Sequence, residues 1–200
     1  MERKQQHDQL LQEWYKSRPE YDTEGEFAWD GPSNWEIYFN EKPRILFLLK
    51  EPRLGYQPNQ ANLIYDQRGY NLIRWVYLIQ NLYLKRGSVI ELPLNHELYD
   101  KYFGNYSRIA EINIKKCNQE NSTSDDNIII TYAQNDVLFL KRQIELVDPQ
   151  IIICASTFSS YREIYANEFA NSTLVQLNKT VAEYRVREHT AWKHHNKLVL

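Results

Sequence analysis

The sequence predicts an α/β domain in which helices cover both faces of a central parallel sheet. Three short and largely apolar runs indicate strands at residues 44–49, 108–114 and 150–155, because strands buried on both faces of a parallel sheet carry few polar residues. Predicted helices alternate with these strands, which is typical of right-handed crossovers within one parallel sheet. The fourth strand is either residues 182–189, which alternate in polarity, or residues 197–200. We therefore expect a three-layer α/β/α architecture around four parallel strands.

The amino-terminal part predicts one helix followed by a loop. A narrow apolar stripe near its end, from Leu10 to Tyr15, indicates a helix over residues 1–15 that ends before Pro19. Scattered prolines and glycines with isolated aromatic residues predict an ordered surface loop over residues 19–43. Because 200 residues fit one ordinary domain, we expect this part to pack on the sheet core of a single domain.

Further helices are expected between and after the strands. Apolar residues at helical spacing predict a helix over residues 70–83. A polar loop at residues 118–127 precedes another helix, whose apolar positions lie between Val137 and Val147 and include Leu138. Residues 156–169 predict one more helix after the third strand.

Composition excludes several classes of protein. Hydrophobic residues at 42% and charged residues at 25% are globular values, and the sequence has no long apolar run, so we expect no membrane span. The polar opening residues do not resemble a secretory signal, which favours a cytoplasmic protein. Two cysteines, Cys117 and Cys154, are too few for a disulfide framework, a four-thiolate zinc site or an iron–sulfur cluster. We expect no metal and no cofactor, and the sequence predicts no oligomeric state.

The candidate functional residues are those that directly follow the strands. Ligands of open parallel sheets bind beyond the carboxyl ends of the strands. No glycine-rich phosphate loop is present, which disfavours an enzyme with a nucleotide cofactor. A carboxylate, an amide and several basic side chains are instead expected at this edge, as base recognition and glycosidic cleavage require. Because the net charge is -2, any contact with nucleic acid must come from a local basic face.

Three segments resemble the uracil-DNA glycosylase superfamily. They are residues 45–52, residues 110–117 and residues 148–153. In that family the loop after the first strand carries a catalytic acidic residue or Asn just before a proline, and Glu51 holds this position before Pro52. An Asn on the second strand reads the flipped base there, and Asn113 matches it. The resemblance therefore implies a uracil-DNA glycosylase-like fold.

The resemblance also implies an activity, the cleavage of the N-glycosidic bond of uracil or a modified base in DNA, in base excision repair or in defence against foreign DNA. Glu51 would orient the attacking water and stabilise the cationic sugar. The amide of Asn113 would read the base edge, and the Tyr56 ring would support the base by stacking. The residues expected to contact DNA are Arg53, Lys115, Lys116 and Ser156.

The sequence departs from the family at the last loop. The family has a His-Pro-Ser type of loop there, whose His stabilises the leaving base, and no His-Pro pair occurs in this sequence. His189 is the candidate for that role if residues 182–188 are the last strand. If residues 197–200 are the last strand, the loop is missing from this chain, and this second arrangement is favoured.

Other interpretations compete with each of these roles. A non-catalytic module on the same fold, binding nucleic acid or protein, fits the missing loop and the nearly balanced charge, and a hydrolase of free nucleosides or nucleotides is a third possibility. Glu51 can be a solvated loop residue, Asn113 can satisfy backbone groups at a strand end, and the two lysines can form a solvated strand end. Ser156 and Thr157 can instead cap the helix that follows them.

Overall fold

The computed structural model describes part of the chain. It describes residues 2–18, 27–52, 107–117 and 125–167, together with the backbone of residues 175–177, 191–194 and 197–199. The expectations for Arg53, Tyr56 and His189, and for regular structure at residues 70–83 and 182–189, lie outside these residues.

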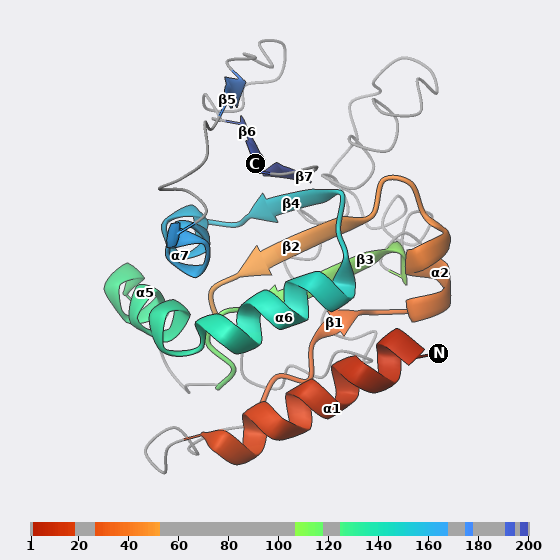
Figure 1. The fold of residues 1–200 in the computed structure, drawn as a ribbon, viewed down its shortest axis with the longest axis horizontal. Coiled ribbons are helices and arrows are strands. Elements are labelled where there is room, and N and C mark those ends of the chain that lie inside the picture. Colours follow the sequence, from red (N-terminus) through yellow and green to blue (C-terminus); the bar gives the residue numbers. More distant parts are fainter. Residues whose placement is uncertain are drawn as a thin grey trace, which may run out of the picture.

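The described strands form one mixed sheet in the order β1-β3-β2-β4-β7-β6-β5 (Figure 1). Four neighbours in the middle of this order, β3, β2, β4 and β7, are parallel, while β1, β6 and β5 pair antiparallel at the two edges. The strands are β1 Gly31–Pro32, β2 Ile45–Leu49, β3 Ile109–Asn113, β4 Ile151–Cys154, β5 Val175–Leu177, β6 Ala191–His194 and β7 Lys197–Val199. The four expected parallel strands are therefore confirmed, and residues 197–199 supply the fourth.

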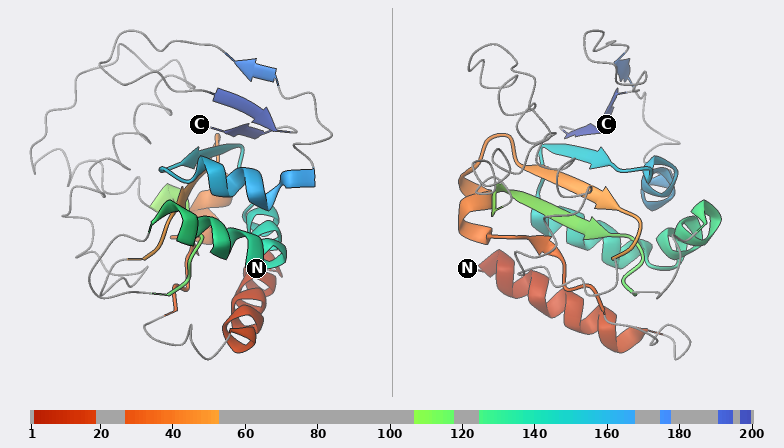
Figure 2. Two further views of the ribbon diagram at one scale, coloured as in Figure 1. Left: turned by 90° about the vertical axis from the view of Figure 1, so that its left-hand side faces the viewer. Right: turned by 180° about the vertical axis from the view of Figure 1, so that it is seen from behind.

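One face of the sheet packs against helices α1 Glu2–Ser17, α5 Asp126–Asn135, α6 Val137–Val147 and α7 Phe158–Ile164. Leu46, Leu48, Ala110, Ile112 and Ile152 belong to the same buried apolar cluster as side chains from these helices. Figure 1 shows α1 lying alongside α6, and the right-hand view of Figure 2 shows the strands in front of α6.

The opposite face of β2, β3 and β4 is buried as well. It carries apolar side chains such as Phe47 and Ile153, together with Glu111 and Asn113 from β3. These strands therefore have two buried faces, which explains why their sequences are nearly continuous apolar runs.

The expectation of a loop over residues 19–43 is wrong in part. Within the described residues of this range, Gly31 and Pro32 form β1, and α2 spans Trp35–Asn40. The Asn34 side chain caps α2 by accepting a hydrogen bond from the Ile37 N–H at 3.0 Å. Gly31 has φ +142°, and a Cβ there would come within 2.8 Å of the His7 ring, so both backbone and space require glycine.

The helices differ from expectation in where they begin and end and in which of their apolar residues are buried. Two helices, α5 and α6, follow the polar loop in place of one, and Asp136 separates them. Asp125 begins α5 early by accepting a hydrogen bond from the Asn127 N–H. Leu138, expected on the apolar face of α6, is 78% exposed, and Tyr15 of the expected stripe on α1 is 51% exposed. No helix in the described part of the chain is long and apolar enough to cross a membrane.

Candidate functional site

The strand order places a switch point between β2 and β4. These are the first and third parallel strands along the chain, and the other two lie on their outer sides. Doubly wound sheets bind ligands outside the carboxyl ends of the strands at such a point. Lys50 and Glu51 directly follow β2, and Ala155 and Ser156 directly follow β4. The structure thus places Glu51 and Ser156 after the two strands that flank the switch point.

An ion pair joins the ends of β2 and β3. The backbone ladder continues past both strands, because the Ile114 N–H donates to Leu49 O and the Lys115 N–H donates to Lys50 O, each at 2.9 Å. The Lys115 ammonium group then donates to Glu51 Oε2 at 3.2 Å. The Lys115 side chain is only 1% exposed and that of Glu51 only 10%.

Two contacts fix the surroundings of this pair. The Lys115 ammonium group lies 5.5 Å from the centre of the Tyr132 ring, a distance at which the ring face attracts a cation. The Lys50 ammonium group lies 2.6 Å from Asp126 Oδ1 in the first turn of α5. Glu51 thus pairs with Lys115, while Lys50, the residue before it in the chain, binds the carboxylate of Asp126.

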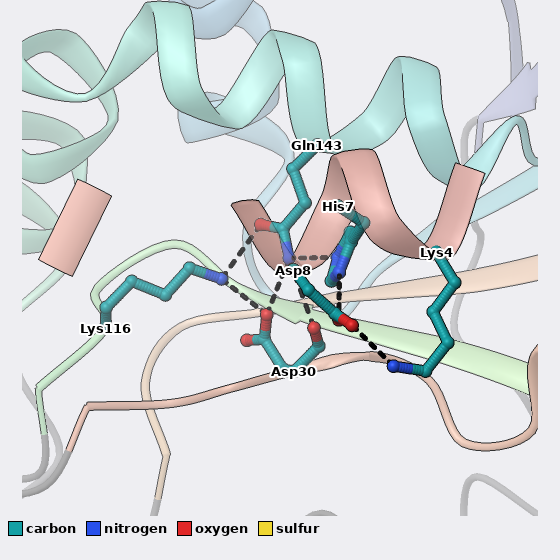
Figure 3. A network of polar contacts seen from close by, with 6 residues as sticks. All are labelled: Lys4, His7, Asp8, Asp30, Lys116 and Gln143. Carbon is teal, nitrogen blue, oxygen red and sulfur yellow. Dashed lines mark hydrogen bonds and ion pairs between the residues drawn. The ribbon is translucent and has the colours of Figure 1, made fainter. Parts of the chain in front are cut away.

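Asp30 is the centre of a second and more deeply buried group of polar side chains, which we call the Asp30 cluster: His7, Asp30, Asn113, Lys116 and Gln143. Asp30 Oδ1 accepts from Lys116 Nζ at 2.6 Å and from Gln143 Nε2 at 2.8 Å (Figure 3). Asp30 Oδ2 accepts from the backbone N–H of Asn113 at 2.6 Å and from its Nδ2 at 3.0 Å. Four donors therefore converge on one carboxylate.

The cluster ties together distant parts of the chain. His7 comes from α1 and Gln143 from α6, while Asp30 precedes β1 and the other two members end or follow β3. Gln143 Nε2 lies 3.1 Å from His7 Nε2, and Gln143 Oε1 accepts from Lys116 Nζ at 3.0 Å (Figure 3). Gln143 therefore links the imidazole to the ion pair.

Burial dominates the electrostatics of the cluster. Loss of hydration lowers the pKa of His7 from 6.5 to about 4, although Asp30 and Asp8 oppose the change. Loss of hydration also lowers the pKa of Lys116, against the attraction of Asp30. The Lys116 ammonium group lies 4.8 Å from the centre of the Trp14 ring, which offers a second stabilising contact.

The structure brings some of the candidate residues together, among those that it describes. Glu51 and Lys115 pair at one side of the end of β3, and Asn113 and Lys116 bind Asp30. Glu51 is not a solvated loop residue, Asn113 does not spend its amide on backbone groups, and the lysines do not form a solvated strand end, so these three alternatives are wrong. A phosphate contact from either lysine would require its ion pair to open.

Ser156 and Thr157 behave differently from a pair of capping residues. Ser156 is exposed and has φ +59°, a left-handed backbone conformation that residues other than glycine rarely adopt. Thr157 is the N-cap of α7 by position, but its hydroxyl makes no capping hydrogen bond and donates to Leu48 O at 2.7 Å. The hydroxyl thus joins α7 to β2, and Ser156 is left with an exposed side chain near the switch point.

Sequence reasoning missed three members of the Asp30 cluster. Gln143 lies between Leu140 and Val147 on the buried face of α6, and His7 lies four residues before the buried Leu11 of α1. A polar residue at an apolar position of a helix is a detectable signal. Asp30 has no such signal, because its partners come from separate elements.

No group of three or more His, Cys, Asp or Glu residues in the described ranges could hold a metal ion. Among known proteins, no family model matches the sequence, and neither a curated protein nor a solved structure matches it.

Proposed function

We propose that the protein is a DNA glycosylase that hydrolyses the bond between the sugar and uracil or a modified base, on a three-layer fold like that of the uracil-DNA glycosylases. The main support is the placement of one carboxylate. Glu51 follows the first parallel strand at the switch point, next to the end of the strand that carries Asn113. Both positions carry the side chains that the family resemblance requires.

The chemistry needs a fixed negative charge. When the bond to the base breaks, its electron pair leaves with the base and the sugar becomes cationic, until water adds to the sugar carbon and loses a proton. The Lys115 ammonium group lies 3.2 Å from Glu51 Oε2 and attracts negative charge at that position. An ionised Glu51 would stabilise the sugar cation and orient the water.

The test is an assay for alkali-labile abasic sites. Duplex and single-stranded oligonucleotides carrying uracil, deaminated purines or modified cytosines are incubated with the full chain and with variants Glu51→Gln and Asn113→Ala. Glu145→Gln is the matched control, because it makes the same change at an exposed position on α6.

We expect at least one substrate to be cleaved by the wild type and by the control. Loss of a group that acts on water typically lowers the rate by about 100-fold or more, so Glu51→Gln should be nearly inactive. A failure to cleave any of these substrates, or full activity in Glu51→Gln, contradicts the proposal. Circular dichroism of each variant checks that it is folded.

A second candidate is a non-catalytic module that binds nucleic acid. The observation that favours it is the engagement of the site residues with one another, since Asn113 and both lysines are buried and bound to carboxylates. Salt-sensitive binding of oligonucleotides without any abasic site would support this candidate over the glycosylase.

A further inference from the structure

We propose that Asp30 is a positioning residue that fixes the orientation of the Asn113 amide, so that the amide offers its carbonyl oxygen to the base and selects a base edge with an N–H donor. This inference rests on the proposed function. It adds a residue that the family resemblance does not supply, and it defines the polarity of the hydrogen bond by which the base is read.

An ionised carboxylate only accepts hydrogen bonds. Asp30 Oδ2 lies 3.0 Å from Asn113 Nδ2 and 2.6 Å from the backbone nitrogen of the same residue. If the amide turned over, Asn113 Oδ1 would face Asp30 Oδ2, and two acceptors would lie at hydrogen-bond distance without a proton between them. Asp30 therefore permits one of the two amide orientations.

The carboxylate of Asp30 is itself held in one orientation. Its other oxygen, Oδ1, accepts from Lys116 Nζ and from Gln143 Nε2. The side chain of Asp30 is fully buried, so no water replaces these partners. Rotation of the carboxylate would break charge-assisted hydrogen bonds to groups from two separate elements, which makes Asp30 a rigid reference for Asn113.

The remaining polar atom of the Asn113 amide is its oxygen, Oδ1. Asn113 is 0% exposed, yet its Oδ1 has no hydrogen-bond partner among the described residues. A buried acceptor without a partner destabilises the fold, and the great majority of buried acceptors in native proteins have a partner. A ligand N–H would satisfy Oδ1, so the unpaired atom is the second observation that points to a ligand.

The hydrogen-bond polarity has a consequence for the substrate. Uracil carries an N–H at ring position 3, where cytosine has a bare nitrogen that only accepts. An amide oxygen that faces this position accepts a hydrogen bond from uracil. Facing cytosine, the same oxygen would lie opposite another acceptor, with no proton between them. Sites that hydrogen-bond a specific donor reject the analogue without it strongly, because their own buried group is then unpaired.

The test compares two variants that disturb the same cluster differently. The double variant D30L/K116M removes both buried charges and the acceptor that faces Asn113 Nδ2, so the Asn113 amide is free to turn. Q143M removes one hydrogen bond from Asp30 Oδ1 and leaves the contact of Oδ2 with Asn113 in place. Q143M is therefore the matched control for a merely structural effect.

The functional readout is the ratio of abasic-site formation on matched oligonucleotides with a single uracil or a single cytosine. We expect Q143M to keep the wild-type ratio and D30L/K116M to lower it by about tenfold or more, because the amide oxygen is then no longer held toward the base. An unchanged ratio in D30L/K116M overturns the proposal.

A second readout needs no activity. In the 15N-labelled protein, the Asn113 side-chain amide is assigned by its absence in Asn113→Ala, and its exchange with solvent is followed. We expect one Nδ2 proton to exchange slowly in the wild type and in Q143M and rapidly in D30L/K116M. Rapid exchange in the wild type overturns the positioning role, whereas slow exchange without cleavage of any oligonucleotide would sink only the glycosylase proposal and leave the positioning role standing.

Discussion

Acid should destabilise the fold through His7. Burial lowers the pKa of this imidazole from 6.5 to about 4, so the ring is neutral in the folded protein at neutral pH. The unfolded chain binds a proton at His7 below about pH 6.5, but the folded protein binds it only below about pH 4. Stability is therefore fully present above pH 6.5 and falls as the pH drops through this window.

The size of the effect follows from the pKa. A shift of this size corresponds to about 3 kcal/mol of unfolding free energy. The folded protein disfavours the proton mainly because the ring loses its hydration, and Lys116 and Lys4 add repulsion. Asp30 and Asp8 act in the opposite direction but do not restore the ordinary value.

Urea unfolding at about pH 7 and about pH 4 measures this loss in the wild type, in His7→Gln and in His7→Phe. A Gln oxygen can replace His7 Nε2 as a partner of Gln143, whereas Phe keeps a ring and loses the hydrogen bond. Both variants should lose about 3 kcal/mol less than the wild type between the two pH values, because neither side chain titrates. Equal pH dependence in all three proteins would refute the reasoning.

Three further changes test a buried ion pair, a close packing contact and a buried hydroxyl group. Lys116→Met should lower the unfolding free energy by about 3–5 kcal/mol in urea titrations, because it leaves Asp30 buried without its cation. The second substitution D30N should recover most of this loss. Losses that simply add in the double variant would contradict the ion pair. Gly31→Ala should cost about 2–5 kcal/mol by the same assay, since a Cβ would lie 2.8 Å from the His7 ring at a φ of +142°; a loss below about 1 kcal/mol would mean that the ring moves aside. Tyr38→Phe should change the unfolding free energy by less than about 1 kcal/mol, because the buried hydroxyl of Tyr38 has no hydrogen-bond partner among the described residues. A thermal unfolding midpoint well below that of the wild type would show that the hydroxyl does have a partner.

The parallel strands could be predicted because their burial on both faces determines the composition of their own sequences. Strands covered on both faces need apolar side chains at nearly every position, so β2 and β4 are visible as apolar runs. β1 has only two residues, Gly31 and Pro32, and a strand of this length has no period to detect. The six residues of α2 depend on the cap from Asn34, a signal too short to stand out among the prolines and glycines around it.

The candidate site was predictable as a set of positions and not as a set of contacts. The rule that ligands lie beyond the strand ends selects Glu51 and Asn113 from the sequence. Lysines are almost never buried unless they are paired, so DNA contact and a solvated strand end were the two interpretations that the sequence offered for Lys115 and Lys116. Their carboxylate partners lie 64 and 86 positions away along the chain, and only the fold brings them together.

The two buried ion pairs let the end of β3 hold carboxylates from two neighbouring parts of the chain. Lys115 binds a carboxylate that follows β2, and the adjacent Lys116 binds one that precedes β1. The proposed catalytic carboxylate and the proposed base-reading amide of Asn113 are therefore held from a single stretch of four residues. A movement of Glu51 relative to that amide would require a buried ion pair to open, which is expensive in an environment of low polarity. Groups held in this way need no rearrangement when charge develops on a substrate, and this is the condition under which electrostatic catalysis is strongest.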